Sequence, residues 1–397
     1  MNRRRALFLS AAAPWFATGA RPRATRLLFS TEGNVSSVGL DGEGERPLRY
    51  DIAGIRRWQP GPPMHDGRRL IMIGWEDGKI HLGNVRSHQY LCDVASGTIE
   101  REILTNGRLA PHYGPVAVMP GDQRLLVNVI LKGDSLLYDV KLDGSDARPV
   151  PTPKPGFSYG FSLSADGRWV AYHTTGPNRR PYRIYVQRLD GSQQLCIAEK
   201  AEHLYFGPVW SPDAQWLLYA DCVPRTDPGH DWADLCVGKP DGSQHRVVTV
   251  GQALWFASSY GAPGNRGSGS IIPEWSRDGR HILVNRRMAG SKVPWEFQPD
   301  RPDTDHFNRD FKPQAARGGS HVCLVDARTG SIRELTPQRE GLWEWGPHFA
   351  PDGKRIVFHR AAAGELPAIW VMNADGSGQR LITRGTDHQG AIFARWM

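Results

Sequence analysis

Short apolar runs alternate with polar turns along the whole chain, and no long stretch has the 3.6-residue period of an amphipathic helix. β-branched and aromatic residues dominate the runs, whereas Asp-Gly pairs such as Asp166-Gly167 and Asp352-Gly353 mark the turns. The chain is also rich in glycine (44 residues) and proline (30 residues), which favour turns over regular helix. The pattern therefore predicts an all-β protein.

One turn motif, Ser-Pro-Asp-Gly or a close variant, recurs along the chain with similar flanking sequences. An apolar run precedes each copy, a second run follows it directly, and two more runs complete the unit. The copies begin at Pro63, Val118, Leu163, Trp210, Trp275 and Phe349. Four antiparallel strands per unit, with glycine supplying the positive φ that tight hairpins need, are typical of a β-propeller blade.

The two ends of the chain supply complementary parts of one more unit. Residues 390–397 read as a first strand without its turn, and residues 26–30, 35–38 and 46–49 read as the second, third and fourth strands. Pairing the ends would close the ring and remove an open sheet edge. We therefore expect a seven-bladed β-propeller of four-stranded antiparallel blades, closed by the N- and C-terminal strands, as a single domain over 25–397.

Residues 1–20 combine a basic start with a short apolar run and small residues, which is the layout of an export signal. Arg3, Arg4 and Arg5 before Leu-Phe-Leu look like a twin-arginine address, the alternative being a frayed basic tail. No other segment approaches the roughly 18 apolar residues of a membrane span. We expect a periplasmic or secreted monomer.

The net charge of +8 favours an acidic ligand, and the chain has no run of Lys and Arg interleaved with aromatics, so nucleic acid is not the expected partner. Five cysteines without CxxC spacing argue against a zinc ribbon and against a full disulfide framework. Cys222 and Cys236 flank one loop and could pair. In the same loop, Cys222, His230, Asp231 and Asp234 offer metal ligands in no known metal-binding pattern.

The Ser-Pro-Asp-Gly-Lys/Arg unit, together with the Asn-Ala-Asp-Gly-Ser sequence at 373–377, resembles the repeat of TolB-type β-propellers. The resemblance covers nearly all of the chain after residue 25. Among enzymes with this repeat, the oligogalacturonate lyase family is the most similar in layout, because its last repeat also has a Pro-x-Phe-x-Pro-Asp turn like 347–352. That resemblance implies β-elimination with a catalytic metal held by two histidines. Glu344 and Gly346 occupy their positions here, so we expect the metal site to be lost or rebuilt.

In a propeller, the start of the first strand and the loop between the second and third strands of each blade open on one face, which we call the mouth. Aromatic and hydrogen-bonding residues recur at these places, and such groups suit a sugar ring. Our candidate catalytic residues are His112, His203, Tyr159 and Tyr205. Our candidate substrate-binding residues are Arg57, Trp58, His173, Arg286, Trp343, Trp345 and Gln389. A rebuilt site for a divalent metal (Mn or Ca) would use Glu344, His388, His203 or His230.

Packing within the blades is the alternative for each tyrosine and tryptophan of this set, and His173 and His359 occupy equivalent positions that suit a shared structural role. The long segment 288–320 is expected to be a loop insertion over the mouth. Two functions remain open at this point. One is a lyase that cleaves an acidic, uronate-containing glycan by β-elimination. The other is a non-catalytic TolB-like scaffold that binds a protein or cell-wall partner.

Overall fold

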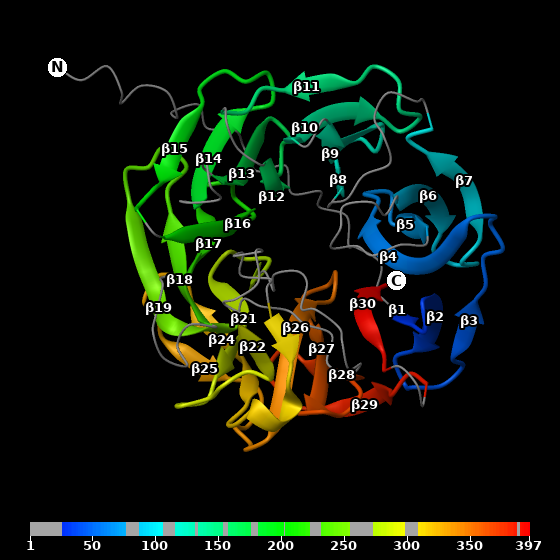
Figure 1. Cartoon of the computed structure of the whole chain (residues 1–397), viewed down its shortest axis with the longest axis vertical. Coiled ribbons are helices and arrows are strands. Elements are labelled where there is room, and N and C mark those ends of the chain that lie inside the picture. The colour runs from blue at the N-terminus through cyan, green and yellow to red at the C-terminus, as the bar shows by residue number, and fades with distance from the viewer. Residues whose placement is uncertain are drawn as a thin grey trace.

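The computed structural model is a β-propeller, in which the strands are arranged in a ring around a centre (Figure 1). It describes residues 26–76, 87–105, 116–131, 134–153, 158–175, 182–201, 203–222, 232–254, 273–297, 309–386 and 390–397. Among these residues, no helix is long and apolar enough to cross a membrane.

Four strand positions repeat in each unit. The first strands are β4 (Ile55–Pro63), β8 (Val116–Val118), β12 (Ser158–Leu163), β16 (Leu204–Trp210), β20 (Glu274–Trp275), β26 (Leu342–Phe349) and β30 (Ile392–Trp396). The second strands are β5 (Arg69–Glu76), β9 (Arg124–Leu131), β13 (Trp169–Thr175), β17 (Leu217–Cys222), β21 (His281–Arg287), β27 (Arg355–Ala362) and β1 (Arg26–Thr31). The third strands are β6 (Ser87–Asp93), β10 (Asp134–Lys141), β14 (Tyr182–Arg188), β18 (Trp232–Gly238), β24 (Ser320–Asp326), β28 (Ala368–Asn373) and β2 (Asn34–Gly39). The fourth strands are β7 (Ile99–Ile103), β11 (Arg148–Val150), β15 (Leu195–Ala198), β19 (His245–Leu254), β25 (Ile332–Glu334), β29 (Arg380–Thr383) and β3 (Arg46–Leu48).

The first strands lie nearest to the centre of the ring, as β8, β12, β16, β26 and β30 show, and the fourth strands form the rim (Figure 1). Four sheets each hold one unit: β4 to β7, β8 to β11, β26 to β29, and β3-β2-β1-β30. A 12-stranded sheet runs from β12 to β25, and within it single residue pairs, Tyr182 with Leu204 and Ala253 with Arg286, join successive units. The prediction of an all-β propeller with four-stranded antiparallel blades is confirmed.

The first and last described strands, β1 and β30, meet in one sheet, as the sequence predicted. Strand β30 pairs antiparallel with β1, with Leu27 opposite Trp396 and Leu28 opposite Arg395. Behind them a buried cluster joins Leu27 and Phe29 to Ala394 and to the neighbouring strand β28 through Ile369. This sheet therefore joins segments that are far apart in the sequence.

The segment predicted as a loop insertion at 288–320 contains some regular structure in its described part. A hairpin pairs β22 (Trp295–Phe297) with β23 (Arg309–Phe311), and the 3-10 helix η5 (Pro313–Ala315) follows. Val293 of this segment is buried against Trp343 and Phe206, which belong to two different units. The described part of the insertion is therefore packed onto the propeller.

The turn between first and second strands is held by its own side chains. Ser211 Oγ donates to Asp213 Oδ1 (2.6 Å) and accepts from the Trp216 N–H (2.9 Å). Ala214 has φ of +54°, and the equivalent Gly167 has φ of +68°, which explains why glycine is common at this position. The repeated motif therefore encodes a turn.

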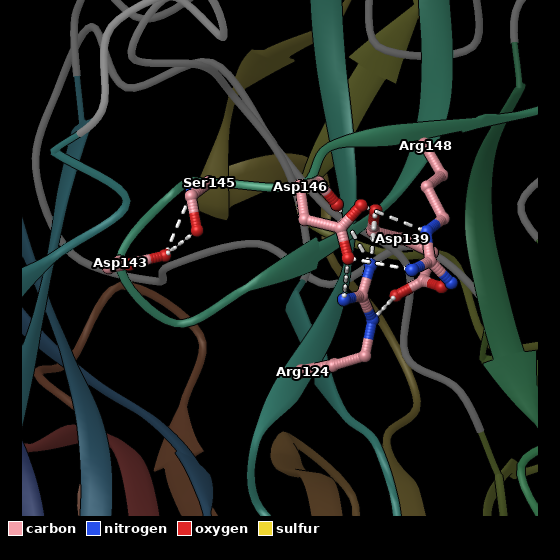
Figure 2. Close-up of polar contacts among 6 residues, drawn as sticks. All are labelled: Arg124, Asp139, Asp143, Ser145, Asp146 and Arg148. Atoms are coloured by element: carbon pink, nitrogen blue, oxygen red, sulfur yellow. Dashed lines mark hydrogen bonds and ion pairs between the residues drawn. The ribbon is translucent and has the colours of Figure 1, made fainter.

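The turn between third and fourth strands is also held by its own side chains, and Figure 2 shows one copy. Asp143 Oδ1 accepts hydrogen bonds from the N–H (2.8 Å) and the hydroxyl (2.6 Å) of Ser145. Arg124, on β9, donates through Nε to Asp139 Oδ1 (2.5 Å) and through Nη1 to Asp146 Oδ2 (2.8 Å). One arginine thus ties the second strand to the third strand and to the turn that follows it.

Tryptophans at the ends of three first strands connect each unit to the preceding one. The indole N–H of Trp210 donates to the carbonyl of Ser162 (3.2 Å), and that of Trp275 donates to the carbonyl of Val209 (3.1 Å). Trp396 donates in the same way to the carbonyl of His348 (3.3 Å). These bonds join neighbouring first strands directly.

All five cysteines have free thiols. Cys222 and Cys236 lie on the paired strands β17 and β18 but are not bonded to each other, so the pairing that we considered is absent. Cys92, Cys236 and Cys323 are fully buried, as expected for small hydrophobic residues.

Candidate functional site

The clearest group of reactive side chains lies at the mouth end of β16 and β17. His203 directly precedes β16, and its Nδ1 lies 2.9 Å from both carboxylate oxygens of Asp221 on β17. The two side chains are 12% and 6% exposed, respectively. Because a carboxylate can only accept, Nδ1 carries the proton and Nε2 is left as a base. Nε2 has no hydrogen-bond partner among the described residues.

Tyr205 packs against the imidazole ring of this histidine. Its ring stacks on His203, with 5.6 Å between centroids and 25° between planes, and it lies directly opposite Asp221 in the β16–β17 pairing. Burial, together with the charge of Asp221, raises the pKa of the Tyr205 phenol, so that it stays protonated. Burial also raises the pKa of Asp221, and the hydrogen bond from His203 opposes that effect. Asp234, buried on β18, faces Asp221 across the sheet.

Trp343, Trp345 and His173 lie deeper than expected for sugar-binding residues. Trp343 and Trp345 are buried in a cluster with Phe206, and Trp345 stacks on His359 at 5.6 Å. His173 is 3% exposed, stacks on Tyr182 and meets the edge of Phe206. We assign packing to these side chains in the described conformation. His173 and His359, which were expected at equivalent positions, are both buried, each as the fifth residue of its second strand.

Two of the candidate residues on β4 differ in their surroundings. Trp58 is 4% exposed and packs between Tyr50 and Tyr90, with ring centroids 4.8 and 5.2 Å away. Its neighbour Arg57 has a buried Nη2 without a hydrogen-bond partner in the described part of the chain. A buried guanidinium nitrogen that lacks a partner is suited to an anionic ligand. Arg57 remains a candidate, whereas Trp58 fills the core.

Arg286 lies on β21 opposite His321 of β24. Burial lowers the pKa of His321, and the charge of Arg286 adds to that effect. Arg286 therefore influences a buried histidine at the mouth end of its blade.

Glu344 is at the centre of a buried ion-pair network. Its carboxylate accepts from Arg360 Nε (2.7 Å), from the Thr336 hydroxyl and from the Val322 N–H (3.3 Å). Ser320 Oγ accepts from the Glu344 N–H (3.0 Å), so β26 is tied to β24 as well as to β27. Burial raises the pKa of Glu344, and Arg360 counteracts this. Both carboxylate oxygens are engaged by donors from within the protein.

Comparisons with known proteins agree with this architecture. The chain is 30% identical to the Tol-Pal system protein TolB of Anaeromyxobacter dehalogenans (strain 2CP-C) over 205 residues, which cover 51% of this chain and 36% of that protein. It is 27% identical over 187 residues to an uncharacterized peptidase, YuxL, of Bacillus subtilis (strain 168), covering 44% of this chain and 24% of the relative. The chain thus spans between 24% and 36% of the length of these curated relatives. No family model matches it.

Among solved structures, an oligogalacturonate lyase in complex with manganese superposes with a TM-score of 0.53 at 16% identity, over 90% of this chain and 85% of that one. A prolyl endopeptidase superposes with a TM-score of 0.57 at 11% identity, over 95% of this chain and 51% of that one. The chain is a β-propeller, and about half of its sequence is similar to TolB. At these low sequence identities, the similarity to solved structures supports the fold and not the function.

A metal in this propeller would need ligands other than those that the lyase resemblance suggests. Glu344 has both oxygens occupied by protein donors, and Gly346 has no side chain. In the part of the chain that the structure describes, no three His, Cys, Asp or Glu side chains form a group that could hold a metal ion. The described residues therefore do not fit the metal centre.

Several predicted site residues lie outside the described residues, namely His112, His230, His388 and Gln389. The same holds for residues 1–20, for 298–308 of the insertion and for the side chain of Tyr159, whose backbone on β12 pairs with His173. Sequence reasoning missed Asp221, because its meeting with His203 depends on the register of β16 against β17. An acidic residue near the end of a second strand, diagonal to a histidine just before the first strand, is the signal that could have identified it.

Proposed function

We propose that this protein is an exported carbohydrate-active enzyme, a lyase that cleaves an acidic, uronate-containing oligo- or polysaccharide by β-elimination. The supporting observation is His203: its Nδ1 is anchored by buried Asp221, Tyr205 stacks behind it, and its Nε2 is free to act as a base. A base oriented by a carboxylate is the arrangement that proton abstraction requires.

In the proposed reaction, His203 Nε2 takes the proton on the carbon α to the uronate carboxylate. The electron pair forms the new carbon–carbon double bond, and the bond from the β carbon to the glycosidic oxygen breaks. The imidazolium of His203 then returns the proton to that oxygen, so atoms and charge balance without a co-reactant. A cation must stabilise the negative charge on the carboxylate, and Arg57 is our candidate.

Tyr205 acts in this proposal as a positioning residue, because it is only 6% exposed and lies behind the imidazole. The net charge of +8 suits an acidic glycan, and the fold of a lyase is compatible with this chain.

We also propose that the ring has seven blades, since the four separate sheets and the units within the 12-stranded sheet follow the repeat of the sequence. The leader at 1–20 would send the mature protein to the periplasm or the medium, where a monomer would meet its acidic oligosaccharide.

The sequence similarity to TolB supports a second candidate, a non-catalytic periplasmic propeller that binds a protein or cell-wall partner. In a scaffold, the His203–Asp221 pair would stabilise the start of β16. The two candidates differ in one observable, because only the lyase requires a free imidazole nitrogen for turnover.

The test is ultraviolet absorbance of the unsaturated uronate product, measured on a panel of acidic glycans with purified protein. We expect product from at least one glycan, and a loss of roughly 10²–10⁴-fold in rate for His203→Ala. Asp221→Asn should leave the imidazole misoriented and also lower kcat, while Tyr205→Phe should shift the pH profile more than it changes KM.

A matched control is His65→Ala. His65 Nδ1 also lies 2.9 Å from an aspartate, Asp122, but this pair lies at the turn after β4, at the opposite end of that strand from Arg57. Its variant should keep full turnover. Absence of product across the panel, with and without added divalent metal, would overturn the lyase proposal and favour the scaffold.

A further inference from the structure

Three first strands in succession carry a titratable residue at one equivalent position. Glu274 of β20 pairs with Leu283, His348 of β26 pairs with Val357, and Arg395 of β30 pairs with Leu28. In each pair, the partner is the second apolar residue of its strand. On β8, β12 and β16, the same position holds Ala117, Ser162 and Val209. The titratable residues are therefore confined to one arc of the inner ring.

Hydrogen bonds connect the three side chains, with His348 between Glu274 and Arg395. Glu274 Oε2 lies 3.3 Å from His348 Nδ1 and accepts the Phe349 N–H at 3.1 Å. On the other side of the imidazole, Arg395 Nη1 lies 3.3 Å from His348 Nε2. Arginine can only donate and carboxylate can only accept, so neutral His348 carries its proton on Nδ1. The Glu274 and His348 side chains are 37% and 35% exposed, which leaves them accessible to a ligand.

Arg395 differs from Arg124 and Arg360, which are also partly buried, in its contacts. Arg360 contacts Glu344, and Arg124 contacts Asp139 and Asp146. In the described residues, Arg395 makes no ion pair, and its hydrogen bonds go to His348 and to the Ala394 carbonyl (3.3 Å). Burial lowers the pKa of this guanidinium, and the charge of Glu274 only partly compensates. A desolvated arginine without a contacting carboxylate is a recognition group for an oxyanion.

We propose that Glu274, His348 and Arg395 form a second binding site on the inner ring, for a small hydroxylated carboxylic acid. The guanidinium of Arg395 takes the carboxylate through its remaining N–H groups. Glu274 Oε1, which has no hydrogen bond within the described residues, accepts from a ligand hydroxyl. His348 holds the two end groups in place.

This site is separate from the mouth and does not depend on the proposed lyase activity. Val209, the β16 counterpart of the arc, is six residues beyond His203. At about 3.3 Å per residue, the two levels are up to about 20 Å apart along the strand. Loss of one site should therefore leave the other intact.

Isothermal titration calorimetry of the full chain with galacturonate, galactose and inorganic phosphate tests the proposal. Galacturonate has both the carboxylate and the hydroxyls, so we expect it to bind most tightly. Galactose lacks the carboxylate and phosphate lacks the sugar hydroxyls, so each should bind at least about tenfold more weakly. Equal affinity for phosphate and galacturonate would overturn the assignment of Glu274 as a hydroxyl acceptor.

Arg395→Gln should weaken galacturonate binding by about tenfold or more, and Glu274→Gln should weaken it less, because only one hydrogen bond changes character. Arg395→Lys keeps the charge without the planar fork, so it provides a milder variant if Arg395→Gln does not fold. Arg168→Gln, a substitution at a 66% exposed arginine, is the matched control and should bind like the parent.

His203→Ala separates this site from the mouth. It should abolish turnover and keep galacturonate binding if both proposals hold. Binding that is lost in His203→Ala but unchanged in Arg395→Gln and Arg395→Lys would overturn the inner site, because the ligand would then sit at the mouth.

Discussion

His203, His65 and His88 each contact a carboxylate, and their surroundings give them different properties. His203 is nearly buried and has one aspartate partner, and His65 is 49% exposed beside Asp122. His88, on β6, lies between two carboxylates, with Nε2 3.0 Å from Glu76 and Nδ1 2.8 Å from Glu102. With an acceptor at each nitrogen, only the doubly protonated ring satisfies both contacts.

The pH dependence of stability should reveal His88. Burial lowers the pKa of this imidazole, but the hydrogen bonds and charges of Glu102 and Glu76 outweigh it and raise the pKa. The pKa of His88 is therefore higher in the folded protein than in the unfolded chain, where it is about 6.5. Its ion pairs contribute fully to stability below the unfolded pKa, and this contribution is lost as pH rises through the folded pKa. Because the His88 side chain is 24% exposed, we expect its ion pairs to contribute about 1 kcal/mol at most to the free energy of unfolding.

Urea unfolding of the parent and of His88→Gln between about pH 5 and pH 9 is the measurement. The difference in unfolding free energy should be largest at the acid end and shrink towards the alkaline end. A difference that stays constant over this range would show that the ion pairs do not contribute.

At the scale of elements, the indole bonds between first strands predict how the units depend on one another. Trp275→Phe keeps most of the apolar surface of this buried side chain but removes the donor to the Val209 carbonyl. We expect the free energy of unfolding to fall by about 1–3 kcal/mol, since the buried indole no longer donates to the Val209 carbonyl of the preceding unit. Thermal or urea unfolding measures it.

Trp216→Phe is the control for that variant. The Trp216 ring lies under Lys239 at 4.2 Å, and the indole N–H makes no hydrogen bond among the described residues. Replacement of the Trp216 indole should lower the free energy of unfolding by only about 0.5 kcal/mol. Equal effects of the two substitutions would mean that the bond between units contributes nothing beyond ring packing.

The elements were largely predictable because their signals are local. The turn chemistry of Ser211 and Asp213 fixes where first strands end, and the expected strand at 26–30 is observed as β1. The site was less predictable, because it depends on strand register. Nothing local indicates that Asp221 faces His203, or that Glu344 is enclosed by Arg360 and Thr336.

At the scale of the whole molecule, the sheet that joins β1 to β30 closes the ring. Strand β1 has β2 on one side and β30 on the other, so without β30 its inner edge would present unpaired N–H and C=O groups. The pattern at the chain ends predicted this pairing, whereas no comparable signal in the sequence marked the join between units at Ala253 and Arg286.

Deletion of residues 392–397 should therefore destabilise the entire propeller. It removes β30, together with buried Ala394 and the Trp396 bond to the His348 carbonyl. We expect a loss of roughly 3 kcal/mol or more in unfolding free energy, with aggregation through the exposed β1 edge. A synthetic peptide of residues 390–397 added to the truncated protein should restore its melting temperature, because it can pair with β1 as β30 does, while a scrambled peptide of the same composition should not. If the truncated protein melted like the parent, ring closure by β30 would not contribute to the stability of the fold.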